Sequence, residues 1–464
     1  MYIGLDLGTS GVKGVLVNNK GEIINEVTKE YPLLTPQEMW REQNPCDWFT
    51  QTIEVLKLLV VGYESKIRSL SFSGQMHGLV ILDEYDNVIR PAILWNDQRT
   101  VNEVKYLNAK IGKEKLISET GNIAFTGFTA PKIMWLKNNE IDNFNKISKI
   151  MLPKDYLVYK LTNRFVSDVS DMSGTLFYNV EEKKYSEYMI NLIGINKKQL
   201  PEVLESSDIV GNLIKEFSDQ LNLPDNVKVI VGGGDQAVGS IGTGVVNNND
   251  FNISLGTSGV VFIASDKYYV DKISYLHSFA HANKKYHLMG VTLAAGGSLE
   301  WFKQTFYNKS NYDEIFGDIE NTKIKDTVYY LPYLSGERSP INDPYARGTF
   351  VGFSLTHNKK HFSRAVIEGI TYSLKQIYES IKALGVNVNR IRLTGGGAKN
   401  DIWCQMIADI FGISVETIDA KEGPAYGAAI LAMVEDKNFE TVEDACNVLI
   451  KVDKQYYPNN ENNN

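Results

Sequence analysis

The chain has 464 residues, a net charge of −8 and a hydrophobic content of 43%. Its length suggests roughly two to four domains, and its composition is that of an ordinary globular protein. The negative net charge argues against a nucleic-acid surface, which needs a basic face, but it does not exclude binding of a nucleotide.

The cysteines and apolar runs favour a cytoplasmic protein. Cys46, Cys404 and Cys446 are far apart, so they indicate neither a disulfide framework nor a zinc site. The chain starts directly in a strand pattern without the pattern of a signal peptide. We expect no membrane segment, because no apolar run approaches the roughly 18 residues of a span.

The first predicted elements form a hairpin. Apolar runs at 3–7 and 12–17 flank the turn Gly8-Thr9-Ser10-Gly11, and Asp6 lies near the end of the first run. The glycines let a phosphate approach the backbone, and Thr9 and Ser10 offer hydroxyl and amide donors. The pattern therefore predicts a phosphate-binding turn beside a carboxylate that could face a metal ion.

Polar residues follow several later strands. A helix is predicted at 45–60 from its apolar periodicity. The strand at 67–71 runs into Gly74–Gly78, which contains Gln75, Met76 and His77, and the strand at 92–94 runs into Trp95-Asn96-Asp97. Such polar clusters can bind sugar hydroxyls, although each can also be a capped turn.

Asp235 is the most suggestive single residue. It follows an apolar strand at 227–231 and the glycine triplet 232–234, and it precedes a helix predicted at 236–244. A rigidly held carboxylate in this position can act as a general base. The alternative is a helix-start acid that complements the helix dipole.

Part of the hairpin recurs in the second half. Leu7–Gly11 is repeated letter for letter as Leu255–Gly259, again between apolar runs, while Asp6 aligns with Ser254. This favours a duplication. We predict one domain at 1–246 with an inserted lobe at about 100–225, a second at 247–458, and a disordered tail at 459–464.

Repeated glycine-rich turns favour a nucleotide site. A second triplet, 395–397, also joins a strand to a helix, and helix N-termini favour anions. A long helix around 366–384 and a helix at 427–435 complete the second half. The sequence contains no P-loop, and the loose dinucleotide pattern at 232–237 lacks the acidic residue expected about 20 positions later.

Nine segments together identify a resemblance to the FGGY carbohydrate kinases, most closely to the xylulokinase branch: 2–13, 74–78, 91–97, 152–157, 232–235, 255–259, 331–338, 364–369 and 395–398. The resemblance implies an α/β fold with two actin-like (ribonuclease-H-like) domains flanking a catalytic cleft. It also implies ATP-dependent phosphorylation of D-xylulose to D-xylulose 5-phosphate, with ATP and Mg²⁺ as cofactors.

Residue roles follow from the same resemblance. Asp235 matches the catalytic base, and Asp6 matches the catalytic acid that faces Mg²⁺. The expected substrate-binding residues are Gln75, Met76, His77, Asn96 and Asp97. The expected nucleotide-binding residues are Thr9, Ser10, Lys13, Thr257, Gly296, Glu300, Gly396, Gly397 and Asn400.

Three alternatives stay open. Gln236 stands where close relatives usually have Asn, so the substrate could be another ketose or polyol. An actin-like or Hsp70-like ATPase would need no polyol-binding pair such as Met76 and His77. A sugar-binding regulator would not need both Asp6 and Asp235. A homodimer is compatible with the sequence, and we expect neither nucleic acid nor membrane as a partner.

Overall fold

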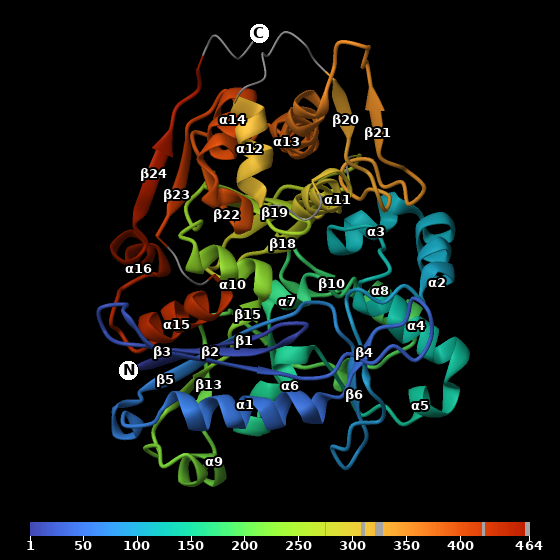
Figure 1. Ribbon diagram of the computed structural model, residues 1–464. Helices are drawn as coiled ribbons and strands as arrows, with labels where there is room; N and C mark the ends of the chain where they lie inside the picture. The colour runs from blue at the N-terminus through green and yellow to red at the C-terminus, as the bar shows by residue number, and fades with distance from the viewer. Residues whose placement is uncertain (274, 308–310, 321–327, 420–422, 460–464) are drawn as a thin grey trace. The chain divides into compact units, whose positions relative to one another are not determined.

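The computed structural model describes residues 1–464 except 274, 308–310, 321–327, 420–422 and 460–464 (Figure 1). The chain forms two compact units. The first contains residues 1–246, 278–286 and 420–450, and the second contains 247–277, 287–419 and 451–464. The predicted boundary at 246/247 coincides with the end of the first long segment, but two later segments also belong to the first unit.

A mixed sheet forms the centre of the first unit. Its order is β13-β14-β5-β1-β2-β3, and β15 also pairs with β5. β1 runs antiparallel to β2 and parallel to β5. The bounds are β1 Tyr2–Leu7, β2 Gly11–Val17, β3 Ile23–Glu30, β5 Ser69–Gly74, β13 Ile209–Asn212, β14 Lys228–Ile230 and β15 Gly233–Gly234.

The sheet of the second unit repeats this order. Its strands within that unit read β19-β17-β16-β22-β23-β24, with β16 antiparallel to β17 and parallel to β22, while β18 lies almost wholly in the segment 278–286. Thus β16 corresponds to β1, and β22 to β5, which confirms the predicted duplication at the level of topology. The bounds are β16 Phe251–Leu255, β17 Gly259–Ser265, β18 His277–Ala280, β19 Tyr286–Thr292, β22 Ile391–Thr394, β23 Val415–Ile418 and β24 Val452–Tyr456.

The two hairpins differ in register although their turn letters are identical. Leu7 pairs with Val12 in the first unit. The equivalent Leu255 pairs with Gly259, one position earlier relative to the repeat. The first turn is therefore one residue wider than the second.

The predicted helices are present with small changes at their ends. They are α1 Pro45–Leu59, α10 Asp235–Gly242, α13 Lys359–Ala383 and α15 Pro424–Glu435, and a further helix, α11, spans Gly296–Phe306. Pro45 suits the first turn of α1, whose N-cap Asn44 accepts a hydrogen bond from Cys46 N. Gly385 follows α13 with a φ of +84°, a conformation that ends helices and that glycine adopts at little cost.

The remaining elements lie mostly in the segment 100–225 predicted as an inserted lobe, whose β13 nevertheless joins the main sheet. Within that segment are the helices α2 Val101–Tyr106, α3 Lys113–Thr120, α4 Thr129–Asn139, α5 Ile141–Asn145, α6 Pro153–Thr162, α7 Val169–Met172, α8 Glu187–Ile193 and α9 Lys215–Gln220, and the short strands β8 Lys149–Met151, β9 Val166–Asp168, β10 Tyr178–Asn179, β11 Lys184–Tyr185 and β12 Glu202–Leu204. Outside it are the helices α12 Tyr312–Glu320, α14 Asp401–Phe411 and α16 Val442–Leu449, and the short strands β4 Glu42–Gln43, β6 Val80–Leu82, β7 Ala92–Ile93, β20 Tyr329–Leu331 and β21 Thr349–Val351.

Helix α15 completes the first unit although it comes from the far end of the chain. It packs against β1, β5 and α10, and Figure 1 shows it beside β1 and β2. The crossing with α10 is close, because a Cβ atom built on Gly427 would lie 1.9 Å from Val238 O. All ten residues from Ala425 to Val434 are buried, so α15 is part of a core and not a surface helix.

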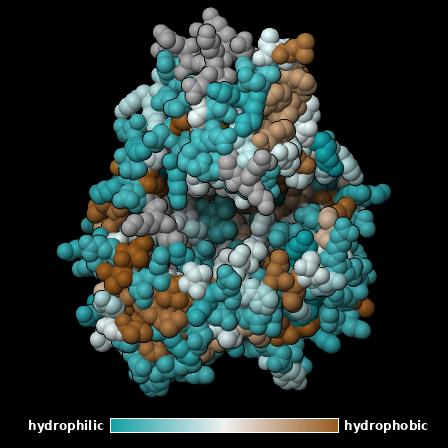
Figure 2. Space-filling view, in the orientation of Figure 1, coloured by the Kyte–Doolittle hydropathy of each residue, from teal (hydrophilic) through white to brown (hydrophobic). Residues whose placement is uncertain are grey.

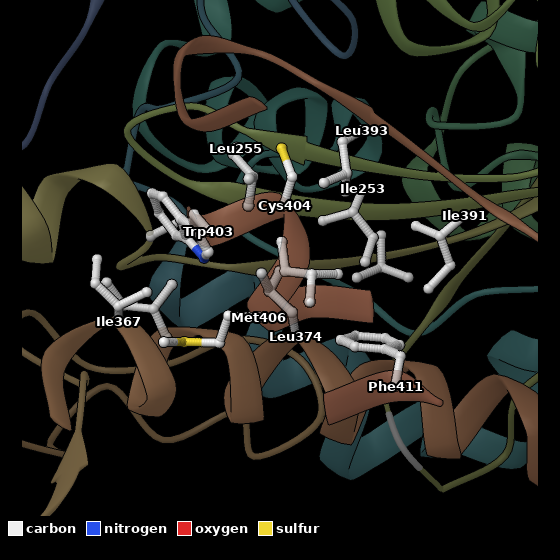
Figure 3. Packing of buried hydrophobic residues seen from close by; sticks show 14 of the residues in the cluster. Ile253, Leu255, Ile367, Leu374, Ile391, Leu393, Trp403, Cys404, Met406 and Phe411 are labelled. Atoms are coloured by element: carbon white, nitrogen blue, oxygen red, sulfur yellow. The ribbon is translucent and has the colours of Figure 1, made fainter. Parts of the chain in front are cut away.

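The second unit has a separate apolar core. Ile253 and Leu255 of β16, with Ile391 and Leu393 of β22, meet side chains of α13 and α14 (Figure 3).

Hydrophilic residues cover much of the face shown in Figure 2, with apolar groups between them. In the described part of the chain, no helix has the length and apolar character needed to cross a membrane. The three cysteines are free, as their spacing predicted. Of the predicted tail at 459–464, only Asn459 lies within the described residues.

Candidate functional site

Asp235 is the first residue of α10 and is partly exposed, whereas the glycine turn before it is buried. Burial, assisted by the negative charge of Asp6, raises its pKa to about 7. Gln236 Nε2 lies 3.5 Å from Asp235 Oδ1, at the limit of a hydrogen bond, and opposes the shift. A carboxyl group with this pKa can take up and release a proton near neutral pH, which a general base requires.

The turn before Asp235 is packed tightly on both sides. Gly232 has a φ of +72°, and a Cβ atom there would lie 1.9 Å from Phe72 O. Gly233 and Gly234 pair with Ser73 and Gly74 of β5. The glycine triplet is therefore required by close backbone approach and by backbone conformation. This packing fixes the direction in which α10 begins and hence the position of Asp235.

Met76 packs against this turn, and His77 follows Met76 in the chain. Met76 is 4% exposed, and a Cβ atom on Gly234 would lie 2.8 Å from its Cγ. His77 has a φ of +68°, which is uncommon for a residue other than glycine. Its Nδ1 is 3.0 Å from Gly174 O, so Nδ1 carries the proton and donates it in this contact. Nε2 is then an acceptor when the ring is neutral.

Buried donors hold the backbone of His77 in this conformation. Thr129 Oγ1 and Lys132 Nζ donate to His77 O at 3.1 and 2.8 Å. Lys132 Nζ also donates to Gly127 O at 2.7 Å. Burial lowers the pKa of Lys132 well below its ordinary value. The surroundings therefore over-determine the backbone at His77, as is common where strain serves a function.

The other three predicted substrate-binding residues differ from one another. Asn96 Oδ1 is buried and accepts no hydrogen bond from any residue that the structure describes. Asp97 is fully buried, and its two oxygens accept four hydrogen bonds from Arg41 and Arg99. Gln75 is 2% exposed and donates to Gln43 Oε1 at 3.1 Å. Asn96 is thus the one of the three whose polar group is available, whereas Asp97 and Gln75 act in internal networks.

The first hairpin turn is held by this polar network. Gln43 Nε2 donates to Thr9 O at 2.7 Å, and Trp95 Nε1 donates to Thr9 Oγ1 at 2.9 Å. Gly8 N donates to Gly11 O at 3.0 Å. Lys13 pairs with Glu26 at 3.3 Å in the adjacent strand. The turn that contains Thr9 and Ser10 is therefore ordered by contacts inside the first unit.

A separate pocket lies in the second unit. Its volume is about 770 Å³, within the range of small-molecule sites. It contains all six nucleotide-binding residues predicted for this half of the chain. Leu299, Trp301, Phe316 and Trp403 supply apolar lining. The predicted residues in the lining are Thr257, Gly296, Glu300, Gly396, Gly397 and Asn400.

Backbone turns form the polar end of this pocket. Gly296 N and Gly297 N donate to Gly256 O and Thr257 O, at 2.8 and 2.9 Å. A Cβ atom on Gly296 would lie 2.7 Å from Gly256 O, so glycine is needed there. Asn400 caps α14 by accepting from Trp403 N at 3.0 Å. Two helix N-termini, those of α11 and α14, therefore contribute to the pocket and favour an anionic ligand.

Glu300 is the acidic member of the pocket. Its carboxylate lies 2.7 Å from Lys303 and also interacts with Tyr312 and Gln304. These hydrogen bonds, chiefly the one from Lys303, lower the pKa of Glu300 to about 2. It therefore stays ionised, and its contacts fix part of the wall. The aromatic lining residues and Tyr312 were not predicted, because isolated aromatic residues in a sequence indicate a core as often as a pocket.

The repeated sheets and the two kinds of site together define an actin-like α/β phosphotransferase. The family model for the N-terminal domain of the FGGY family of carbohydrate kinases matches residues 1–242, and that for the C-terminal domain matches residues 251–435. The chain belongs to the FGGY family of carbohydrate kinases, and it is an enzyme that uses ATP as the phosphoryl donor.

Similar proteins cover nearly the whole chain. A xylulose kinase of Bacillus subtilis is 41% identical over 99% of this chain and 93% of its own length. The crystal structure of a ligand-bound xylulose kinase from Lactobacillus acidophilus is 27% identical, covers 100% of this chain and 94% of its own, and has a TM-score of 0.94. A gluconate kinase structure from the same organism is also 27% identical, with the same coverage and a TM-score of 0.95.

Proposed function

We propose that the protein transfers the γ-phosphoryl group of ATP to the 5-hydroxyl of D-xylulose, giving D-xylulose 5-phosphate in pentose catabolism. The observation that carries this proposal is the packing of Met76 against the glycine turn that leads to Asp235, with His77 next to Met76 in the chain and oriented by Gly174 O. The names of the relatives with about 40% identity support the same substrate. Asn96, with its available buried oxygen, supplies a further group for a sugar hydroxyl.

Asp235 acts as the general base. A sugar hydroxyl is a weak nucleophile until its proton has an acceptor. The pKa of Asp235 at about 7 makes the carboxylate basic enough to accept that proton, while much of it is still ionised at neutral pH. Since α10 and the glycine turn are rigid, the carboxylate can also orient the attacking oxygen.

Each unit binds one substrate in this proposal. The pocket of about 770 Å³ in the second unit takes ATP, with the N-termini of α11 and α14 near the phosphates. The apolar and aromatic lining suits the adenine ring. Thr9, Ser10 and Lys13 of the first hairpin supply further donors for the transferred phosphoryl group.

Mg²⁺ fits the acidic residues that are present. In the described ranges, no group of three or more His, Cys, Asp or Glu side chains could hold a metal. Mg²⁺ usually binds through one or two carboxylates, several waters and substrate phosphates, so a fuller protein site is not needed. Asp6, whose charge acts on Asp235, is the proposed ligand. The ion would neutralise phosphate charge.

Another ketose, a polyol or a sugar acid is the alternative substrate class. The gluconate kinase with a TM-score of 0.95 carries this fold with another named substrate. Gln236 stands beside Asp235 where the resemblance to the xylulokinase branch led us to expect Asn, and Gln is longer than Asn by one methylene. It therefore changes the space next to the base.

A coupled assay of ADP release over a panel of sugars tests the substrate. We expect D-xylulose to have the highest kcat/KM among D-xylulose, D-ribulose, glycerol and gluconate. A preference of tenfold or more for another member of the panel, about 1.4 kcal/mol in transition-state binding, would overturn the assignment. Omission of Mg²⁺ from the same assay should abolish activity, and restoring it should recover activity.

We also propose that the enzyme works in the cytoplasm and forms a homodimer. The free cysteines suit a reducing compartment. Light scattering on the purified protein measures the mass directly against the 52.2 kDa of one chain. A mass of a single chain at working concentration would contradict the dimer.

A further inference from the structure

A buried chain of contacts leads from Lys154 to the turn that carries Asp235. Lys154 Nζ lies 2.6 Å from Asp155 Oδ1 and 2.8 Å from Asp168 Oδ1. Asp168 Oδ2 accepts hydrogen bonds from Ser206 Oγ at 2.7 Å and from both the amide and the hydroxyl of Ser170. These five side chains are at most 1% exposed.

Ser170 connects this buried cluster to the glycine turn 232–234 that precedes Asp235. Its Oγ accepts a hydrogen bond from Gly234 N at 3.1 Å. Because the Ser170 hydroxyl donates to Asp168, its lone pairs are left for Gly234. Gly234 is the N-cap of α10 and has no side chain to cap the helix. The residue directly before Asp235 is therefore held by a group outside its own helix.

Packing leaves the turn little freedom around this hydrogen bond. A Cβ atom on Gly233 would lie 2.6 Å from Ser170 Oγ and 3.2 Å from Asp168 Oδ2. On the other side, Met76 presses against Gly234. Ser170 and Met76 thus hold the glycine pair from opposite sides, so a small shift of either would move Asp235.

Charge balance explains why the chain is fixed. Burial works against the ammonium of Lys154, but the carboxylates of Asp155 and Asp168 outweigh it and raise its pKa. Lys154 therefore remains a cation, and its ion pair with Asp168 holds that carboxylate in place. A buried carboxylate without a cation would be costly, so removing Lys154 or Asp168 would endanger the fold. Ser170 and Ser206 are neutral and can be changed more safely.

We propose that Ser170, oriented by Asp168, is a positioning residue that fixes Asp235 for proton transfer from the sugar hydroxyl. The proposal rests on the role of Asp235 in the proposed function. The competing explanation is structural, because Asp168 is also the N-cap of the short helix α7 through Ser170 N. Under that explanation, Ser170 would affect only the stability of the fold.

The test is Ser170→Ala in the full-length enzyme, assayed with D-xylulose and ATP. A displacement of the order of 1 Å can cost up to about a hundredfold in rate. We expect kcat to fall roughly tenfold and the KM for ATP to stay within twofold. The matched control is Ser218→Ala, which removes a buried serine hydroxyl that donates to Lys215 O, in α9. It should leave kcat unchanged.

A double-mutant cycle with Asp235→Asn shows whether Ser170 acts through Asp235. If it does, Ser170→Ala should have little further effect in the Asp235→Asn background. An unchanged kcat for Ser170→Ala, or the same tenfold loss in both backgrounds, would overturn the proposal. If Asp235→Asn itself has normal activity, the proposed catalytic role fails instead, so the two failures are distinguishable.

Ser206→Ala provides a second variant that does not touch Gly234. It removes one donor from Asp168 but leaves the Ser170 hydroxyl in place. We expect a smaller fall in kcat, of about twofold to threefold, which also vanishes in the Asp235→Asn background. If Ser170→Ala fails to fold, this variant decides: no change in kcat, or a loss that persists without Asp235, rejects the positioning role.

Discussion

Replacing Asp235 by Asn tests the centre of the proposed mechanism. Asn keeps the size and one hydrogen-bonding oxygen of Asp but cannot accept the proton. General-base catalysis typically contributes about 10²–10⁴ in rate, or about 3–5 kcal/mol at roughly 1.4 kcal/mol per decade. We expect kcat to fall by that factor, and by more if the carboxylate also orients the sugar.

The same substitution should increase stability at alkaline pH. Asp235 has a folded-state pKa of about 7 against an ordinary value of 3.8, so between these values the folded protein binds more protons than the unfolded chain. The free energy of unfolding therefore falls as pH rises through this window. Asn carries no charge to desolvate. At pH 8 the free energy of unfolding of the variant should exceed that of the parent by a few kcal/mol, so the variant should melt at a higher temperature. This difference in stability should be smaller at pH 5.

The assay combines steady-state kcat, thermal melting and calorimetric titration with ATP. Asp47→Asn is the control, because Asp47 is also an acid in a first helical turn, that of α1. It should leave kcat unchanged. An Asp235→Asn variant that melts normally, binds ATP and turns over within threefold of the parent would remove Asp235 from the mechanism. A variant that unfolds would favour a structural helix-start acid.

Three further predictions follow from the pKa of Asp235 and from the two glycine-rich turns. The kcat/KM of the parent enzyme should increase with pH as Asp235 ionises, with an apparent pKa near 7, and should level off above it. This increase should be absent from the residual activity of Asp235→Asn. Asp6→Ala should nearly abolish activity through loss of Mg²⁺-ATP positioning, whereas Ser254→Ala at the repeated position should be mild; equal losses would refute the argument from the unequal hairpins. Gly296→Ala would place a Cβ atom 2.7 Å from Gly256 O, so calorimetry should show ATP binding weakened about tenfold, with D-xylulose binding unchanged; unaltered ATP affinity would exclude Gly296 from the nucleotide site.

Periodicity and repeated letters were sufficient to predict much of the fold. The strands β16 and β22, and the helices α1 and α13, have strong apolar patterns and clear end signals. The repeat of Leu7–Gly11 also led correctly to two sheets of the same order. The one-residue difference in hairpin register was not predictable, because five identical letters contain no information about pairing with the opposite strand.

Long-range contacts limited what the sequence could show about the site. The six predicted residues around the nucleotide pocket do meet, because they follow strands or start helices in one sheet unit. Asp97 stays a predicted sugar-binding residue, but its oxygens also accept hydrogen bonds from Arg99 and from the amide of Arg41, and the contact with Arg41 joins residues far apart in the sequence. Ser170 gave no signal at all, since its importance depends on Gly234, which is distant in sequence.

The origin of α15 has a consequence for synthesis of the chain on the ribosome. The sheet face formed by β1 and β5, and one side of α10, are covered by a helix that ends only at Glu435. At 5–20 residues per second, the first 246 residues wait on the order of tens of seconds for that cover. During this interval the nascent chain exposes the apolar surface that α15 later buries. The first unit cannot therefore be expected to fold when expressed as a fragment ending at Val246, and the growing chain is a natural client for a chaperone.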